Sequence, residues 1–175
     1  CKEKVKPNSK KIEINQFKTD AIIERFDKIR YSKGNSTTGE LRTSMQHVMQ
    51  KKCAVFRTHD LITKGIEEYQ EIESSMDGID IKDKSLIFNT DLVEALELHN
   101  LMAQSKVTLY SALNRKESRG AHAREDFKER DDKNWLVHSL AWLNEKGDVK
   151  MGNRAVHMNT LTNYVQPIPP KKRVY

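Results

Sequence analysis

The side chains best able to bind a metal ion are six histidines and two cysteines. A helical zinc site needs two histidines four residues apart, and no two histidines here have that spacing. Cys1 and Cys53 do not form a Cys-x-x-Cys pair. His47 lies six residues before Cys53, which places the two on different faces of a helix. The sequence therefore predicts no metal site.

Motifs that hold a phosphate or activate a serine do not occur in the sequence either. Neither Gly-x-Gly-x-x-Gly nor Gly-x-x-x-x-Gly-Lys is present, and seven scattered glycines cannot build a phosphate-binding loop. No Gly-x-Ser-x-Gly motif is found. Asp131 and Asp132 lie among arginines, which favours a salt-bridged loop over a general acid–base pair. We therefore predict that this chain carries no catalytic and no cofactor-binding residue.

One segment combines charges in an unusual way. Residues 117–127 read Glu-Ser-Arg-Gly-Ala-His-Ala-Arg-Glu-Asp-Phe. A solvated charged loop is one interpretation. The other is an ordered docking loop, in which Arg119 and Arg124 present planar guanidinium groups to carboxylates or carbonyls of a partner. In that case Gly120 supplies the positive φ that a chain leaving a helix needs. The residue types support the two interpretations equally.

Four helices are predicted from the spacing of apolar residues and from capping residues. They cover residues 20–31, 38–53, 58–76 and 90–117, and the second has an alternative end at Phe56. Thr37 to Glu40 has the spacing of a capping box. Either Thr19 or Asp20 would cap the first helix, and Asn89 to Asp91 would cap the last.

The predicted fold class is mainly α, an antiparallel three-helix bundle that resembles a spectrin repeat. The helix at 90–117 has apolar residues on two faces, so we expect it to lie between its neighbours. A β-hairpin is predicted from strands at 135–143 and 149–156 around a turn at 145–148. Three prolines between 167 and 170 indicate an extended tail.

This pattern divides the chain into three parts. Residues 1–36 form an irregular lead-in with a short helix, residues 37–120 the bundle, and residues 121–175 a charged loop, hairpin and tail. The first residue is a cysteine rather than methionine, so we expect a piece of a longer polypeptide.

Composition restricts the classes of function. Thirty-one basic and 25 acidic residues give a net charge of +6, and no stacking aromatics are interleaved with a basic face. We therefore expect no nucleic-acid partner. No apolar run is long enough to span a membrane. Two cysteines make no disulfide framework, which favours a reducing compartment.

Several separated motifs resemble one known family. Residues 117–127 and the run Arg-Asp-Asp-Lys-Asn-Trp-Leu-Val-His-Ser-Leu at 130–140 closely resemble the C-terminal region of the succinate dehydrogenase and fumarate reductase flavoproteins. The resemblance extends from about Leu41 to Tyr175. The other motifs that resemble the family are Met-Gln-His-Val-Met at 45–49, Val-Phe-Arg at 55–57, Glu-Leu-His-Asn-Leu-Met at 97–102 and Pro-Pro-Lys-Lys-Arg-Val-Tyr at 169–175.

The resemblance implies a parent enzyme whose catalytic parts precede this region. Whole subunits of the family bind FAD covalently, oxidise succinate to fumarate and pass electrons to an iron–sulfur subunit and on to quinone in the membrane. No FAD motif or catalytic arginine of the family can be placed here, so the fragment alone is expected to be inactive. Arg119, His122 and Arg124 are expected to dock the end of the long helix onto the FAD-binding domain.

The resemblance also implies partners and a location. The expected partners are the FAD-binding domain of the same chain, the iron–sulfur subunit and, indirectly, the membrane anchor subunits. The expected location is peripheral, on the cytoplasmic face of a bacterial inner membrane or the matrix face of the mitochondrial one.

Alternatives to a succinate dehydrogenase parent stay open. A fumarate reductase flavoprotein is one, because partners outside this region set the direction of the reaction. L-aspartate oxidase shares parts of the Ser-Arg-Gly-x-His segment, but the runs at 130–135 and 169–175 favour succinate dehydrogenase. The last is a basic helical binding module, or an interaction domain with no enzyme attached.

Overall fold

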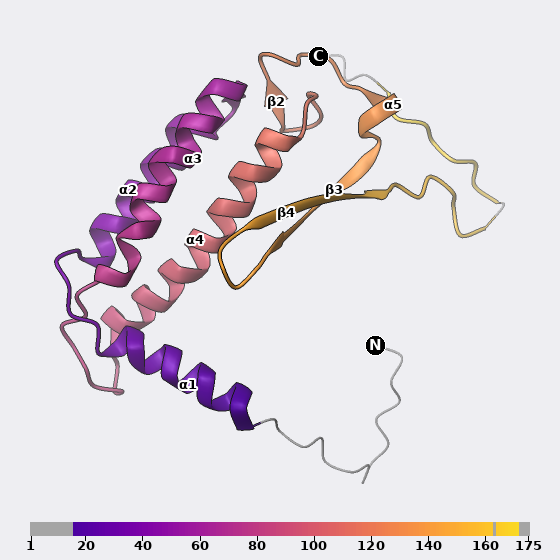
Figure 1. The fold of residues 1–175 in the computed structure, drawn as a ribbon. Helices are drawn as coiled ribbons and strands as arrows, with labels where there is room; N and C mark the ends of the chain where they lie inside the picture. The colour runs from indigo at the N-terminus through magenta and orange to yellow at the C-terminus, as the bar shows by residue number, and fades with distance from the viewer. Residues whose placement is uncertain (1–15, 163, 172–175) are drawn as a thin grey trace, which may run out of the picture.

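Helices dominate the computed structural model, which describes residues 16–162 and 164–171 (Figure 1). The mainly α class predicted from the sequence is therefore confirmed. The elements in chain order are α1 (Gln16–Arg30), α2 (Thr38–Lys52), β1 (Phe56–Arg57), α3 (His59–Ser74), the 3-10 turn η1 (Met76–Gly78), α4 (Thr90–Asn114), β2 (Ala123–Arg124), α5 (Asp132–Trp135), β3 (Val137–Leu143) and β4 (Val149–Ala155).

The core lies where α2, α3 and α4 pack against one another (Figure 1). Ile62, Leu98 and Leu109 are fully buried there, and burial of each such side chain stabilises the fold by about 2 kcal/mol. Helix α4 also contacts α1 and both strands of the hairpin, so its predicted position between neighbours is confirmed. The finer description as an antiparallel, spectrin-like bundle stays a prediction.

Each of the three long helices begins at a side-chain cap. Thr37 and Glu40 form the predicted capping box, in which each side chain accepts a hydrogen bond from the other residue's backbone N–H. Thr58 Oγ1 accepts from Leu61 N in front of α3, and Asn89 Oδ1 accepts from Leu92 N in front of α4. These caps satisfy N–H groups that lack a partner within the helix.

The ends of the helices differ from the sequence-based prediction, including α3, which covers His59–Ser74 rather than 58–76. Helix α1 begins at Gln16, so neither Thr19 nor Asp20 is its cap; lysine and glutamine favour helix and nothing breaks the pattern before position 20. Helix α4 ends at Asn114 rather than Glu117, because Arg115 takes extended backbone angles.

Helix α2 stops at Lys52. Val55 and Phe56, which the alternative end would include in the helix, are 63% and 68% exposed. Phe56 belongs to strand β1, so the alternative end of the helix at Phe56 is wrong.

The predicted hairpin is present. Strands β3 and β4 pair antiparallel from Val137 opposite Ala155 to Leu143 opposite Val149. In the turn, Asn144 Oδ1 accepts from the backbone N–H of Lys146 and of Asp148, and Gly147 has a φ of 85°. Strand β3 starts later than predicted, because Asp131 caps the single-turn helix α5 in front of it.

A short parallel pair, β1 with β2, was not predicted. Phe56 pairs with Ala123 and Arg57 with Arg124. Two residues are too short to give a periodic signal, and parallel partners lie far apart in sequence. The pair brings the segment after α2 beside the charged segment after α4, which fixes the place of the candidate site.

The described part of the tail, after Ala155, contains no helix or strand. Arg130 donates to the carbonyl oxygens of Pro170 and Lys171, at 3.3 and 2.6 Å, so the tail returns to the charged loop. Residues 1–15 and 172–175 lie outside the described residues. The three-part division at 1–36, 37–120 and 121–175 stays a prediction.

Candidate docking site at the end of the long helix

The predicted docking residue Arg124 closes the C-terminal end of α4. Its Nη1 donates to the carbonyl oxygens of Ala112 (2.9 Å) and Leu113 (3.2 Å), which have no partner within the helix. A guanidinium is favoured here because the C-terminal end of a helix carries partial negative charge. The side chain is 1% exposed, so Arg124 is an internal cap.

Asp126 balances the charge of Arg124. The two form a bidentate pair, with Nε to Oδ1 at 2.8 Å and Nη2 to Oδ2 at 2.7 Å. Asp126 Oδ2 also accepts from the backbone N–H of His59 at the start of α3. The Arg124 hydrogen bonds, helped by that backbone bond, hold the pKa of Asp126 down at about 2 against the effect of burial. Arg124 and Asp126 therefore connect the ends of α4 and α3.

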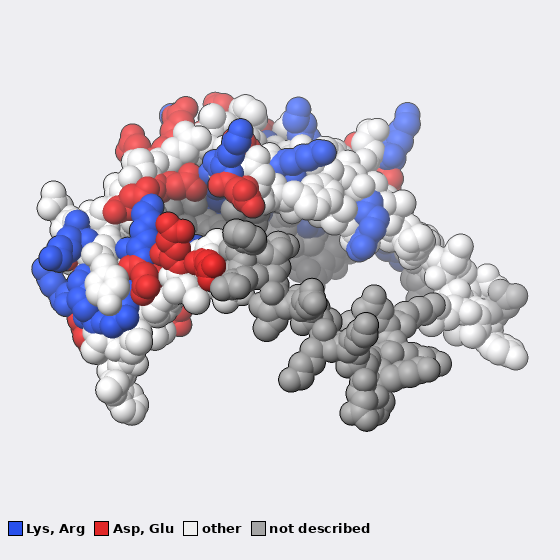
Figure 2. Space-filling model, turned by 60° about the horizontal axis from the view of Figure 1, so that its bottom comes forward, with Lys and Arg blue, Asp and Glu red and all other residues white. Residues whose placement is uncertain are grey.

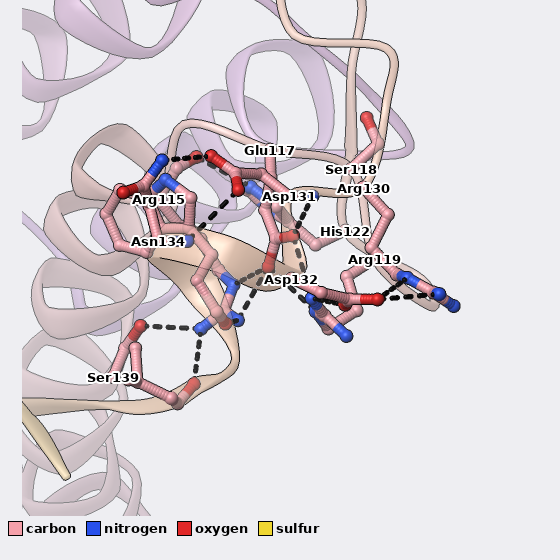
Figure 3. Close-up of polar contacts among 12 residues, drawn as sticks. Arg115, Glu117, Ser118, Arg119, His122, Arg130, Asp131, Asp132, Asn134 and Ser139 are labelled. Atoms are coloured by element: carbon pink, nitrogen blue, oxygen red, sulfur yellow. Dashed lines mark hydrogen bonds and ion pairs between the residues drawn. The ribbon is translucent and has the colours of Figure 1, made fainter. Parts of the chain in front are cut away.

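Glu117 is the buried centre of a second group of charges, which we call the Arg–Glu cluster: Arg115, Glu117, Arg119 and Asp132 (Figure 3). Its side chain is fully buried. It accepts from Arg115 Nε at 2.9 Å, from Arg119 Nε at 2.8 Å and from the backbone N–H of Asp131 at 2.9 Å. Burial raises the pKa of Glu117, but these hydrogen bonds outweigh it and the pKa lies below its ordinary value.

Arg115 connects this cluster to the hairpin. Beyond Glu117, it donates to the carbonyl oxygens of Trp135 (2.6 Å) and Val137 (3.0 Å) and to Ser139 Oγ (3.0 Å). The guanidinium also lies over the Trp135 ring, 5.6 Å from its centroid. Sequence reasoning missed Arg115. A basic residue directly after a long helix was the available signal.

Arg119 lies at the rim of the cluster. Nη2 contacts Glu117 Oε2 at 3.0 Å and Asp132 Oδ1 at 2.6 Å, and the side chain is 25% exposed. Asp132 is shared with Arg130, so the predicted salt-bridged loop is present. Its neighbour Asp131 instead accepts from the backbone N–H groups of Lys133 and Asn134.

Gly120 has the predicted positive φ, 58°. It does not directly follow the helix, however. It lies in a tight turn in which Arg119 and His122 exchange both backbone hydrogen bonds, at 2.8 and 3.0 Å.

The third predicted docking residue, His122, is held between two arginines. Its Nδ1 is 2.7 Å from Arg57 Nη1, and its Nε2 is 3.1 Å from the carbonyl oxygen of Arg115. Because a guanidinium can only donate, Nδ1 is the acceptor and Nε2 carries the proton. Burial lowers the pKa of His122, the bond to the Arg115 carbonyl opposes this, and the charge of Arg57 lowers it further.

The charged segment is thus an ordered loop in this structure. All three predicted docking residues bond within the chain: Arg124 is buried, while His122 and Arg119 are partly exposed. Arg57 and Arg115 complete the site and were not singled out as functional from the sequence.

Backbone N–H groups at a helix start bind the pyrophosphate of a flavin dinucleotide. At α2, α3 and α4 one of these N–H groups is already bonded to the side chain of Thr37, Thr58 or Asn89. The resemblance does not place FAD on these residues. Nor do the described residues bring three or more His, Cys, Asp or Glu together as metal ligands. Among the same residues, no helix is both long and apolar enough to cross a membrane.

Comparison with known proteins assigns this architecture to a class. The sequence model of the family described as fumarate reductase flavoprotein C-term matches residues 42–175. The chain therefore belongs to the C-terminal region of the succinate dehydrogenase and fumarate reductase flavoproteins.

Particular relatives refine the assignment. The chain is 49% identical over 173 residues to a succinate dehydrogenase flavoprotein subunit of Rickettsia bellii, covering 99% of this chain and 29% of that protein. It is 45% identical to the mitochondrial succinate dehydrogenase [ubiquinone] flavoprotein subunit of rice, covering 99% and 27%. The similarity to these subunits therefore extends into the first 40 residues, whereas the sequence motifs alone place its start at about Leu41.

A solved structure shares the fold. An E. coli quinol fumarate reductase chain superposes with a TM-score of 0.79 at 32% identity, over 84% of this chain and 26% of that one. The chain thus spans less than a third of the length of the proteins it matches.

Proposed function

We propose that this chain is the C-terminal part of a succinate dehydrogenase flavoprotein subunit, and that it supports the FAD-binding part of that subunit. The observation that carries the proposal is the ordered loop after α4, whose buried Glu117 and Arg124 hold a shape that a solvated loop would not keep. The identity of 49% to a succinate dehydrogenase subunit over nearly the whole chain supports the choice of parent.

In the proposed parent, the reaction belongs to parts outside this chain. FAD supplies hydride acceptance from succinate, and electrons leave through an iron–sulfur subunit and, indirectly, membrane anchor subunits. The subunit would lie peripherally, on the cytoplasmic face of a bacterial inner membrane or the mitochondrial matrix face. Hydride transfer requires flavin and substrate in fixed geometry, and small displacements lower the rate strongly. A rigid support is what this chain would contribute.

Arg119 is the residue through which the loop is best tested. It lies at the rim of the Arg–Glu cluster with its side chain 25% exposed, whereas Arg124 is buried. In the full-length subunit, Arg119→Ala should lower covalent flavin content and succinate turnover together. Arg154→Ala, an exposed arginine on β4, is the matched control and should change neither. Normal flavinylation, assembly and turnover in Arg119→Ala would remove the docking role.

A fumarate reductase is the second candidate, favoured by the superposition with the E. coli quinol fumarate reductase at 32% identity. The higher identities to succinate dehydrogenase subunits, 49% and 45%, place it behind the first. Comparing the rates of succinate oxidation and fumarate reduction by the intact enzyme distinguishes them.

A basic binding module has weak support. On the face in Figure 2, Lys and Arg lie close to Asp and Glu over much of the surface, apart from one basic group at the left edge. Affinity for nucleic acid from such a surface would fall steeply with salt. A gel-shift assay without retention at low salt eliminates this candidate.

A further inference from the structure

Among the residues that the structure describes, Arg57 is a fixed cation with no carboxylate partner. Its Nε donates to the carbonyl oxygens of Cys53 (3.2 Å) and Ala54 (2.7 Å), and its Nη1 to Nδ1 of His122 (2.7 Å). Within the described residues, this side chain forms no ion pair, and its Nη2 donates no hydrogen bond. By contrast, Arg115, Arg119 and Arg124 each have a carboxylate partner.

Arg57 lines an open surface cavity of about 340 Å³, together with residues of α4 and β3. Arg115, His122, Ser111 and Ser139 line the same cavity, and none of its lining residues is acidic. Its apolar wall is formed by Val107 and Ala112 on α4. Two cations, a neutral histidine and the hydroxyl groups of Thr108, Ser111 and Ser139 make this a site for an anion with a short apolar stem.

A carboxylate is the anion that these groups suit best. A guanidinium binds a carboxylate through parallel N–H···O bonds, and such bonds are stronger in a partly buried site. Because three interactions already hold Arg57, little side-chain entropy is lost on binding. The methylene groups of a glutamate or aspartate would lie against the apolar wall.

We propose that this cavity receives a side-chain carboxylate from the FAD-binding part of the same subunit, with Arg57 as its partner. The inference rests on the proposed function, because it requires that part to be present. The matched Rickettsia subunit is more than three times as long as this chain, so a protein segment is available to fill a cavity that is open here.

The first test uses acetate as the carboxylate probe and the ring nitrogens of His122 as the reporter. Arg57, Arg115 and Arg124 place positive charge around that ring. A carboxylate on Arg57 offsets part of this charge and raises the pH at which His122 titrates. Measured by ¹⁵N NMR on the chain, the titration midpoint should rise and saturate with acetate, but not with chloride at equal ionic strength.

Two variants decide the outcome of this test. Arg57→Gln should abolish the response to acetate, and Arg154→Gln should keep it. No shift beyond that produced by chloride, or an equal shift in Arg57→Gln, would overturn the proposal.

The second test identifies the source of the carboxylate. In the full-length subunit the cavity should already be filled, so acetate should no longer move the His122 titration. Hydrogen exchange at the end of α4 is measured in parallel. It should be slower in the full-length subunit than in the 175-residue chain. If exchange slows but acetate still shifts the His122 titration, the inference about Arg57 is wrong, while the docking of this chain on the FAD-binding part stands. If exchange does not slow, the proposed function fails and the inference fails with it.

Discussion

At the scale of single residues, Arg124 makes the strongest prediction. Replacing it with methionine keeps most of the volume but removes the donors that Arg124 supplies to Asp126 and to the carbonyls of Ala112 and Leu113. Breaking a buried charge pair from one side costs about 3–5 kcal/mol. Arg124→Met should therefore lower the free energy of unfolding by about that amount in urea denaturation.

The control for Arg124 is a second arginine in an exposed setting. Arg154→Met should change the free energy of unfolding by less than about 0.5 kcal/mol. Equal, small effects of the two substitutions would mean that Arg124 does not close the helix.

His122 predicts a pH dependence of stability. Its pKa in the folded chain lies below the ordinary value of 6.5, so the unfolded chain binds a proton first as pH falls. The stability that neutral His122 contributes is therefore complete above about pH 6.5 and is lost as pH falls from there towards the folded pKa. Asp126 loses its contribution only at far lower pH, because its pKa is about 2.

Urea denaturation between pH 7.5 and 5 measures this effect. His122→Gln should reduce the fall in stability, with a share remaining from His99, whose pKa burial also lowers. His47→Gln, which replaces an exposed histidine on α2, should leave the fall unchanged. If stability falls with pH in His122→Gln as it does in the unsubstituted chain, another titrating group causes the fall.

The residue types in the charged segment could be found from the sequence, but their partners could not. Arg119 and Arg124 stand out by residue type, and His122 joins them through the family resemblance. Their contacts depend on where α4 ends and on the pairing of Arg57 with Arg124. Neither has a local signal, so a solvated loop and an ordered one were equally supported until the structure placed them.

At the scale of elements, Arg115 predicts how the hairpin is attached. Arg115→Ala removes the donors to Trp135, Val137 and Ser139 and uncovers part of Glu117. Hydrogen exchange in β3 and β4 should accelerate, while exchange in the centre of α3 stays slow, because the helical core is untouched. Arg115→Lys should not restore protection, since one ammonium cannot replace a planar group with five N–H donors.

If exchange in the hairpin of Arg115→Ala stays as slow as in the unsubstituted chain, packing on α4 alone holds the hairpin.

Helices were predicted better than the segments between them. The starts at Thr38 and Thr90 followed from the side chains of Thr37 and Asn89, which cap locally. The end of α4 depends on Arg115 turning towards the hairpin, a contact 20 and more residues away. Sequence patterns report such distant contacts poorly, which is why α4 was predicted three residues too long.

At the scale of the whole molecule, the described residues form a helical core, a closed polar loop and a hairpin. The charges around the loop are largely compensated inside the chain, with Arg57 as the exception among the residues discussed. This arrangement is what the proposed role, holding its shape for another part of the subunit, requires.

The most direct measurement is made on the purified 175-residue chain, mixed with FAD, succinate and an artificial electron acceptor. We predict no succinate oxidation, measured as reduction of the acceptor, and no tight flavin binding, measured by equilibrium dialysis. Succinate-dependent reduction by this chain alone, or flavin retained through dialysis, would contradict this prediction.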